Sequence, residues 1–474
     1  MSLGRARLGL TLALAAACGA AALALAAYRL GREAGAAAPA APEAVAPSAA
    51  PSPPETSVPA AAQAEPAPGR EPSSLQTDPA PAGPAGTAVP AAPASPTATA
   101  NLSFLACGDI LLARTPGARA ASLGYRYLFR NVKDLVSSAD FAFANLENPA
   151  SYLGEPYPGK PENVTFRADP AALFGLAWAG FDFVSLANNH INDYGPRALA
   201  ETLEYLDLLG VARAGAGRDA EEARRPAIVE RGGVRIAVLA YAQPIWSVVE
   251  ARGSAAYRAA TRSERRAAAA EGRAFDPIPA GLPPLADPSL PGSAARPDAA
   301  SSSRAGAAFA RVEDLRADVA RVLSVYDPDY LFVSVHWGEE HERYPRAFQR
   351  RFGRAAIDAG ATAVLGHHPH VLQSIERYGD GLIVYSLGNF VFDMAEPSTY
   401  ESAAVRFALQ DGRIKRVEIV PISIARYEYA PAPARDAAAR AILEKLKAWS
   451  APYGTELRIE GELGVLDFAP FNAP

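Results

Sequence analysis

All six histidines of this 474-residue chain lie between positions 190 and 370, in three short segments. The segments are SLANNH with His190, VSVHWGEEH with His336 and His341, and VLGHHPH with His367, His368 and His370. Imidazole is the commonest metal ligand in proteins and the usual general acid or base near neutral pH. A chain that uses so few histidines and clusters them in this way is predicted to have one polar site, built from segments that are distant in the sequence.

Polar side chains end several apolar runs that have the length of a strand. Asp109 ends the run 102–109, Glu147 ends 140–147, Asn189 and His190 end 181–190, and His336 lies near the end of 329–338. Taken singly, each has a structural interpretation, as a helix N-cap, a turn residue or a half-buried histidine. Three histidines in the four positions 367–370 are rarely structural. Because active sites of α/β folds form at the carboxyl ends of strands, we predict one site here for metal binding or acid–base chemistry.

The segments that must position this site alternate between strand and helix patterns. A helix is predicted at 196–210, because Pro196 begins it and Gly210 follows its last apolar residue. The other expected elements are a hairpin at 227–241, helices near 312–326, 346–359 and 430–448, and strands within 329–338, 381–393, 403–424 and 456–460. This alternation predicts α/β layers with a mixed sheet or two packed sheets. Residues 243–310 interrupt it, and we interpret them as an insertion or lid beside the site.

The first hundred residues have a different composition from the rest. Residues 1–33 contain an uncharged apolar stretch, 8–28, that is long enough to cross a membrane as a helix. We predict an uncleaved anchor, with a cleaved signal peptide as the alternative; lipidation of Cys18 matches less well. The Ala- and Pro-rich residues 34–100 are predicted to be a disordered linker. The protein is therefore expected in the cell membrane with a single span and an extracytoplasmic globular part, or else secreted after cleavage.

The remaining residues can bury a core. All tryptophans, phenylalanines and histidines follow position 100, and we divide this part into a domain at 101–430 and a C-terminal helix and strand at 431–474 that pack on it. The formal net charge is −5 and no extended basic block is present, which excludes a nucleic-acid partner bound through its phosphates. Cys18 and Cys107 are too far apart to pair, so the fold does not depend on a disulfide.

The order of these motifs resembles the bacterial capsule synthesis protein CapA family, the poly-γ-glutamate capsule proteins. The matching segments, between residues 102 and 400, are CGDI, ANLENP, SLANNHINDYG, GAGRDAEEAR, HWGEE, GHHPHVLQ and SLGNFVFD. This family is similar to the calcineurin-like metallophosphoesterases, which implies a four-layer α/β/β/α sandwich of the metallophosphatase type. It also implies one or two divalent metal ions at the strand ends, without distinguishing manganese, zinc, magnesium and iron.

The resemblance implies a role for each polar residue. The implied metal ligands are Asp109 on the first metal, Glu147 between the two metals, Asn189, His336 and His368 on the second metal, and His370 on the first. His190, beside Asn189, would be the general acid that protonates the leaving oxygen. Two neighbouring cations lower the pKa of a water between them and stabilise an anionic transition state.

The sequence departs from the superfamily pattern mainly at the first metal. The superfamily's first motif is Asp-x-His, and Leu111 stands at the position of its histidine. Glu147 takes the place of a bridging aspartate. GHHPH has one more residue than Gly-His-x-His, which leaves His367 and His368 as alternatives for one ligand role. The first metal position is therefore predicted to be one ligand poorer.

Three functional hypotheses follow. The first is a membrane-anchored, metal-dependent hydrolase that acts on a phosphoester or on an anionic capsule-linked polymer. The second is a non-enzymatic component of the capsule assembly and export machinery, which binds polymer and works with other capsule-synthesis membrane subunits. The third is a secreted binding module with a structural metal. The clustered residues favour the first hypothesis, whereas Leu111 and the anchor with its linker favour the second.

Overall fold

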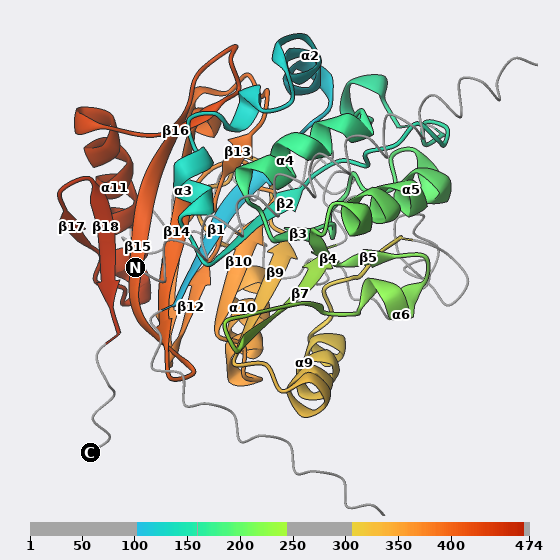
Figure 1. Cartoon of the computed structure of the whole chain (residues 1–474). Helices are drawn as coiled ribbons and strands as arrows, with labels where there is room; N and C mark the ends of the chain where they lie inside the picture. Colours follow the sequence, from blue (N-terminus) through green and yellow to red (C-terminus); the bar gives the residue numbers. More distant parts are fainter. Residues whose placement is uncertain (1–101, 159, 244–305, 469–474) are drawn as a thin grey trace, which may run out of the picture. The chain divides into compact units, whose positions relative to one another are not determined.

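The computed structural model describes residues 102–158, 160–243 and 306–468. Two sheets lie face to face with helices on both outer sides, which confirms the predicted four-layer α/β/β/α class (Figure 1). The predicted anchor at 8–28, the predicted linker at 34–100 and most of the expected insertion lie outside the described residues. Within the described ranges, no helix is both long and apolar enough to span a membrane.

The larger sheet has ten strands in the order β17-β18-β15-β14-β1-β2-β3-β4, with β13 paired to β1 and β16 paired to β15. The strands are β1 (Leu102–Ile110), β2 (Phe141–Leu146), β3 (Phe183–Ser185), β4 (Ala212–Ala214), β13 (Asn389–Val391), β14 (Glu401–Gln410), β15 (Arg413–Ile424), β16 (Pro431–Pro433), β17 (Arg458–Glu460) and β18 (Leu463–Asp467). β1 to β4 are parallel, so their carboxyl ends lie at one edge of the sheet.

The smaller sheet has six strands in the order β11-β12-β10-β9-β7-β6. The strands are β6 (Ala227–Arg231), β7 (Val234–Ala242), β9 (Tyr330–His336), β10 (Ala363–His367), β11 (Ile375–Tyr378) and β12 (Gly381–Val384). β7, β9, β10 and β12 are parallel, and β6 and β7 form the expected hairpin. A separate two-stranded ladder joins β5 (Ala216–Gly217) to β8 (Gly306–Ala307).

The helices connect these strands and cover the outer faces of the sheets. They are α2 (Arg114–Leu123), α3 (Lys133–Ser137), α4 (Leu173–Ala179), α5 (Gly195–Leu208), α6 (Ala220–Ala223), α9 (Val312–Tyr326), α10 (Ala347–Asp358) and α11 (Asp436–Ser450). α5, α9 and α10 match the helices expected at 196–210, 312–326 and 346–359. α4 and α5 lie beside the larger sheet, and α9 and α10 lie beside the smaller one (Figure 1).

The inner core consists of aromatic and aliphatic side chains between the two sheets. The ring of Phe104 in β1 stacks on that of Phe332 in β9, with centroids 3.8 Å apart and planes at 9°. Side chains alternate along β9, so Phe332 faces the larger sheet while Leu331 and Val333 pack in a second cluster with α9 and α10. Because β9 is buried on both faces, it reads as a continuous apolar run in the sequence.

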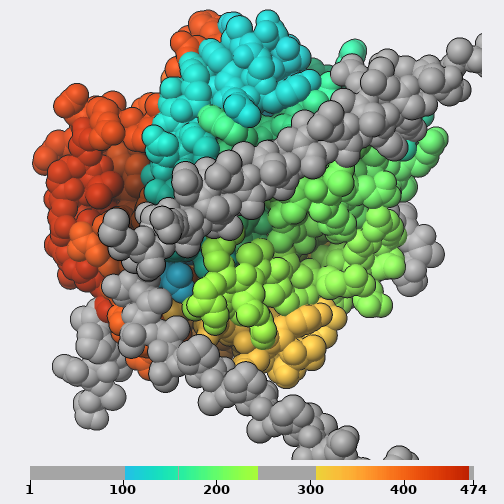
Figure 2. Space-filling view, viewed as in Figure 1, coloured from blue at the N-terminus to red at the C-terminus, as the bar shows by residue number. Residues whose placement is uncertain are grey.

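The C-terminal residues contribute strands to the larger sheet. β18 pairs with β15, and α11 contacts β15 and β18. The views in Figure 1 and Figure 2 both show these residues, in red, directly beside the rest of the described chain. The helix expected at 430–448 begins later than predicted, at Asp436, because residues 431–433 pair with β15 as β16.

The run 381–393, expected to contain one strand, contains two strands that belong to different sheets. Its first part is β12 in the smaller sheet, and its second part is β13 in the larger one. Between them Gly388 has a φ of +69°, and its carbonyl accepts a hydrogen bond from the backbone N–H of Asp109 at 3.0 Å. Gly108 allows this approach, since a Cβ there would lie 2.1 Å from the Gly388 oxygen. The crossing thus holds Asp109 at the edge where the two sheets meet.

Candidate metal centre

The carboxyl ends of five parallel strands deliver the predicted residues to one place. Asp109 is the last residue but one of β1, Glu147 follows β2, and His336 and His367 end β9 and β10. Asn189 and His190 lie in the loop after β3, and His368 and His370 in the loop after β10. All these side chains are buried except that of Asn189, which is half-buried. The strand-end pattern in the sequence therefore corresponds to a single cluster in space.

Glu147 lies at the centre of this cluster and is only partly hydrogen-bonded. Its Oε1 is buried and has no hydrogen-bond partner among the described residues. The Nε2 atoms of three histidines surround this oxygen, at 3.6 Å for His336, 3.7 Å for His370 and 4.0 Å for His190. Burial, followed by the negative charge of Asp109, raises the pKa of Glu147 well above its ordinary value. A cation bound by both this oxygen and the imidazoles would stabilise the buried carboxylate.

Two groups of potential ligands share Glu147. One is Glu147, His336 and His368, and the other is Asp109, Glu147 and His370; in each, the ligand atoms lie within 4.8 Å of one another. The Oδ1 of Asn189 lies 2.8 Å from the Nε2 of His336, at hydrogen-bond distance, so Asn189 places a further oxygen beside the first of these groups. The two groups agree with those that the family resemblance implies, and their donor atoms could hold a pair of divalent cations.

Two histidines of the centre, His336 and His368, are held in the neutral form that binds metals. Burial is the main cause, and it lowers the pKa of His336 well below the usual range and that of His368 to about 3. The charges of neighbouring histidines lower both values further. Since a metal displaces the proton of an imidazole, histidines that are already neutral at pH 7 bind a cation without that competition.

Asn389 orients His370, and the sequence did not predict this role. The Oδ1 of Asn389 lies 2.8 Å from the Nδ1 of His370, and its Nδ2 donates to the carbonyl of Thr399 at 3.2 Å. This arrangement places the proton of His370 on Nδ1 and leaves Nε2 free to coordinate on the Glu147 side. Asn389 belongs to the segment SLGNFVFD, one of the motifs that carried the family resemblance.

Asn145 fixes both carboxylates and was also not predicted. Its Nδ2 donates to Asp109 Oδ1 at 3.0 Å and to Glu147 Oε2 at 3.3 Å. Its Oδ1 accepts from Asn188 Nδ2 at 3.2 Å, and Asn188 also donates to the carbonyl of Leu146 at 2.8 Å. The two asparagines therefore brace the loops after β2 and β3 against each other.

His190 is held by three residues that the sequence analysis did not single out. Its Nδ1 lies 2.8 Å from Asp193 Oδ2, Asp193 pairs with Lys160, and the ring stacks on Phe166 with centroids 4.0 Å apart. Nε2 is thereby directed toward Glu147. Burial, and then the charge of Lys160, lower the pKa of His190 to about 4, against the opposing effect of Asp193. The spacing of His190 and Asp193 in HIND was the available signal, whereas Lys160 had none.

The three histidines of GHHPH have different positions. His367 Nδ1 lies 2.8 Å from Asp109 Oδ1, and His367 belongs to neither ligand group. His368 and His370 belong to the groups, with backbone φ angles of +94° and +58° on either side of Pro369. Such φ angles are unfavourable for residues with a Cβ and are typical of functional sites. Of the two alternatives left open by the sequence, the geometry favours His368 as the ligand.

The pKa values of Asp109 and Glu147 are shifted in opposite directions although both side chains are buried. Burial raises the pKa of Asp109, but the hydrogen bond with His367 and the charges of His367 and His370 outweigh it, and the net shift is downward. No described residue forms a comparable hydrogen bond with Glu147 Oε1. The centre therefore keeps one carboxylate ionised and raises the proton affinity of the other.

The ligand group of Asp109, Glu147 and His370 lacks the histidine of the superfamily motif. Leu111 is fully buried in the inner core, and its backbone N–H donates to Val391. Glu340, which the sequence analysis did not propose, forms a third possible ligand group with His368 and His370, and its side chain is exposed. His341 is also exposed and lies outside all three groups, as expected for a residue at the rim. Glu340 is thus an acidic side chain beside the position that Leu111 leaves with fewer ligands.

Comparisons with known proteins agree with these motifs. Residues 103–394 match the family described as bacterial capsule synthesis protein PGA_cap. The capsule biosynthesis protein CapA of Bacillus anthracis is 28% identical over 338 residues, which cover 71% of this chain and 70% of that protein. The PGA biosynthesis protein CapA of Bacillus subtilis is 29% identical over 70% of this chain and 74% of that protein. A Mycobacterium tuberculosis protein named "Probable polyglutamine synthesis accessory protein" is 26% identical over 61% of this chain and 67% of its own length.

Proposed function

The chain belongs to the bacterial capsule synthesis protein family PGA_cap, and from this premise we propose that it acts in the synthesis or export of an anionic capsule polymer such as poly-γ-glutamate. We further propose that the centre around Glu147 is a metal-dependent hydrolase site of the phosphoesterase type. Its substrate would be a phosphoester or the anionic polymer itself. The apolar stretch 8–28 would anchor the protein in the membrane, with the globular part outside the cytoplasm and near other capsule-synthesis subunits.

The observation that carries the proposal is the buried, unpartnered Oε1 of Glu147 with three imidazole nitrogens around it. A structural glutamate in a protein interior has hydrogen-bond partners for both oxygens or a cationic side chain beside it. Glu147 has neither on Oε1, and it is instead shared by two groups of metal-ligand atoms. Stability alone does not favour such an arrangement, whereas metal binding does.

In this proposal each side chain has a defined task. Asp109 and His370 would hold one cation, and Asn189, His336 and His368 the other, with Glu147 between them. Divalent cations, when bound, activate water and stabilise negative charge in the transition state. Asn389 and Asn145 keep the ligands in position, as their hydrogen bonds to His370 and to the two carboxylates indicate.

His190 would donate the proton to the leaving oxygen. Its Nε2 faces Glu147 Oε1 at 4.0 Å, while Asp193 holds Nδ1 from behind. At neutral pH this histidine is uncharged, because burial and Lys160 lower its pKa to about 4. An anionic substrate beside Nε2 favours the protonated imidazole and so raises the pKa of His190 toward the range in which it can act as an acid.

The test is metal analysis of the purified protein combined with calorimetric titration of manganese, zinc and magnesium. We expect tight binding by the wild type and loss of binding in Glu147→Gln. Hydrolysis of a phosphodiester or of poly-γ-glutamate should require His190 and fall by a factor of about 10² to 10⁴ in His190→Asn, while metal binding remains. Absence of metal binding by the wild-type protein would contradict the proposal.

The alternative is a non-enzymatic, polymer-binding component of the export machinery, and the burial of Leu111 favours it. Because Leu111 cannot bind a metal, the group that contains Asp109 has only Glu147 and His370 as further candidate ligands among the described residues. Bound metal without turnover, together with polymer binding, would support this alternative. Normal capsule in cells whose protein carries both Glu147→Ala and His336→Ala would instead show that the centre is dispensable for either role.

A further inference from the structure

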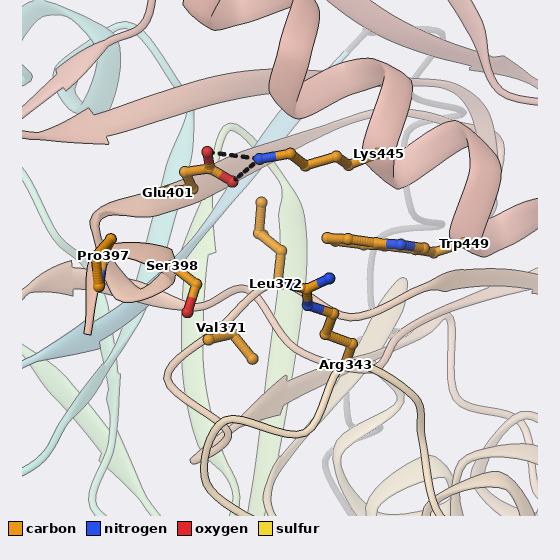
Figure 3. A pocket seen from close by; sticks show the side chains of 8 residues that line it. All are labelled: Arg343, Val371, Leu372, Pro397, Ser398, Glu401, Lys445 and Trp449. Carbon is orange, nitrogen blue, oxygen red and sulfur yellow. Dashed lines mark hydrogen bonds and ion pairs between the residues drawn. The ribbon is translucent and has the colours of Figure 1, made fainter. Parts of the chain in front are cut away.

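A pocket lined in part by Val371, the residue after His370, is assigned no role by the hydrolase proposal. It is a pocket of about 230 Å³ lined by side chains from four segments (Figure 3). The lining residues are Arg343 in the loop after β9, Val371 and Leu372 in the loop after β10, Pro397, Ser398 and Glu401 around the start of β14, and Lys445 and Trp449 on α11. Pockets for drug-sized ligands measure about 300–1,000 Å³, so this one suits a single small unit.

The charges in this pocket are unequally compensated. Lys445 Nζ donates to both carboxylate oxygens of Glu401, each at 2.7 Å, so these two side chains neutralise each other. In the part of the chain that the structure describes, no side chain or backbone group forms a hydrogen bond or ion pair with the Arg343 guanidinium. Arg343 therefore supplies a net positive charge, and its planar donors match the geometry of a carboxylate.

The rest of the lining is apolar and positions this charge. The Arg343 guanidinium lies 5.8 Å from the centre of the Trp449 ring, a cation–π contact that orients it. Val371 and Leu372 are almost completely buried. Figure 3 shows the Lys445–Glu401 pair at one end of the pocket and Arg343 at the other, with Leu372 and Trp449 between them. A ligand that combines one carboxylate with a short methylene chain satisfies both parts of this lining.

The pocket adjoins the metal centre through the residues that hold His370. Val371 directly follows His370, and Ser398 directly precedes Thr399, whose carbonyl accepts the hydrogen bond from Asn389. The pocket and the centre are therefore lined by neighbouring residues of the same two segments. The match to the family ends at residue 394, so Pro397, Ser398, Glu401 and the two α11 residues lie beyond it.

We propose that this pocket is a subsite for one glutamate-like unit of an anionic polymer, with Arg343 pairing with its side carboxylate. Leu372 and Trp449 would contact its methylene groups. The inference rests on the proposed function for the identity of the polymer, but it does not require that the protein hydrolyses anything. It adds a residue that selects the substrate, at a distance from the groups that would carry out the chemistry.

The experiment is a binding titration of the purified full-length protein with a short γ-linked glutamate oligomer, in the presence of a chelator. The chelator removes any binding of carboxylates through a metal ion, so the failure of the hydrolase proposal does not affect the result. Binding is followed by tryptophan fluorescence, with Trp449→Phe to assign the signal to the pocket. We expect Arg343→Gln to weaken binding about tenfold or more, because a charge-assisted hydrogen bond is lost.

The matched control is Arg440→Gln, which removes a positive charge from an exposed position on α11, the helix that carries Lys445 and Trp449. This variant should bind the oligomer like the wild type. A γ-linked glutamine oligomer, which has the same backbone without carboxylates, should bind at least about tenfold more weakly than the glutamate oligomer. Equal binding of the two oligomers, equal competition by inorganic phosphate, or an unchanged affinity in Arg343→Gln would each overturn the proposal.

Discussion

The middle and the ends of the same strands have opposite physical character. In the middle of β1 and β9, Phe104 and Phe332 stack between the sheets and leave no polar group to satisfy. Asp109 follows Phe104 by five residues in β1, and His336 follows Phe332 by four residues in β9. Both belong to the polar centre. The apolar middle stabilises the fold and fixes the distance between the sheets. The ends use this rigid support to hold groups that are unfavourable in a protein interior.

The unfavourable features of the strand ends can be named. Among the described residues, buried side-chain atoms without a hydrogen-bond partner include Glu147 Oε1, His367 Nε2 and His368 Nδ1. His368 and His370 also have left-handed backbone angles. These features lower the stability of the metal-free protein, and a cation bound by Glu147, His368 and His370 would offset this loss. The comparison therefore predicts that substitutions in the middle and at the ends act on different properties.

The largest effect is expected from Phe332→Ala in the apolar middle. Removal of this ring should reduce the free energy of unfolding by about 3–5 kcal/mol, because it leaves a cavity between the sheets. Denaturant titration measures this loss, and Leu208→Ala on the exposed side of α5 serves as the control with little change. The folded fraction should bind metal with the affinity of the wild type. An affinity that fell in parallel with stability would show that the two regions are not separable.

The second effect is a loss of stability in acid that originates at the strand ends. An unfolded histidine titrates near pH 6.5, whereas burial holds the pKa of His190 at about 4 and that of His368 at about 3. Below pH 6.5 the unfolded chain therefore binds protons that the folded protein does not. For His190 alone the loss between pH 6.5 and 4 is roughly 3 kcal/mol in the metal-free protein.

The slope of unfolding free energy against pH tests this origin. His190→Asn should reduce the slope by roughly one proton, or about 1.4 kcal/mol per pH unit. Glu147 contributes to this slope with the opposite sign. Because its pKa is raised in the folded protein, the free energy of unfolding falls as the pH rises above the ordinary pKa of 4.5. The slope should consequently be steeper in Glu147→Gln than in the wild type. An unchanged slope in His190→Asn would place the acid sensitivity elsewhere.

The sequence predicted elements with strong periodicity and missed those that depend on a partner. α9 occupies 312–326 as expected, because its apolar residues follow the helical repeat. The strand expected at 181–190 is only Phe183–Ser185, because the Asn188 side chain bonds to the Leu146 carbonyl and the chain leaves the ladder. The division of 381–393 between two sheets likewise depends on a contact of Gly388 with β1, a segment far away in the sequence.

The same distinction applies to the site. Asp109, Glu147 and the histidines of the two candidate ligand groups were identifiable because their side chains can bind metals and they follow apolar runs. Asn145, Lys160 and Asn389 are common residue types whose importance depends on what lies opposite them in the folded chain. No spacing rule connects Asn389 to His370 or Lys160 to Asp193. A residue's own chemistry is visible in a sequence, whereas its role in orienting another residue requires the tertiary structure.

A third prediction concerns such an orienting residue. Asn389→Ala should weaken metal binding by a factor of about 10 to 100, because His370 loses the partner that keeps its proton on Nδ1. Asn389→Asp, which keeps an acceptor at the same position, should retain most of the affinity. Calorimetric titration measures both variants. Equal loss in the two would mean that Asn389 acts through its hydrogen bond to Thr399 and not through His370.

The smallest effect is expected from Glu147→Gln, and its sign distinguishes a metal ligand from a structural residue. Glu147→Gln should raise the free energy of unfolding of the metal-free protein at pH 7 by about 1 kcal/mol, because it removes a buried carboxyl whose ionisation is unfavourable. The gain should vanish toward pH 4.5, where the carboxyl is protonated in the unfolded chain as well. Glu376 is the matched control, since Arg354 and Tyr385 satisfy both of its oxygens. Glu376→Gln should therefore destabilise the protein by about 1–3 kcal/mol. Both changes in the free energy of unfolding are measured by denaturant titration with a chelator present. Opposite signs for the two substitutions would mean that Glu147 is kept for metal binding at the expense of stability. Destabilisation by both substitutions would mean that Glu147 is structural.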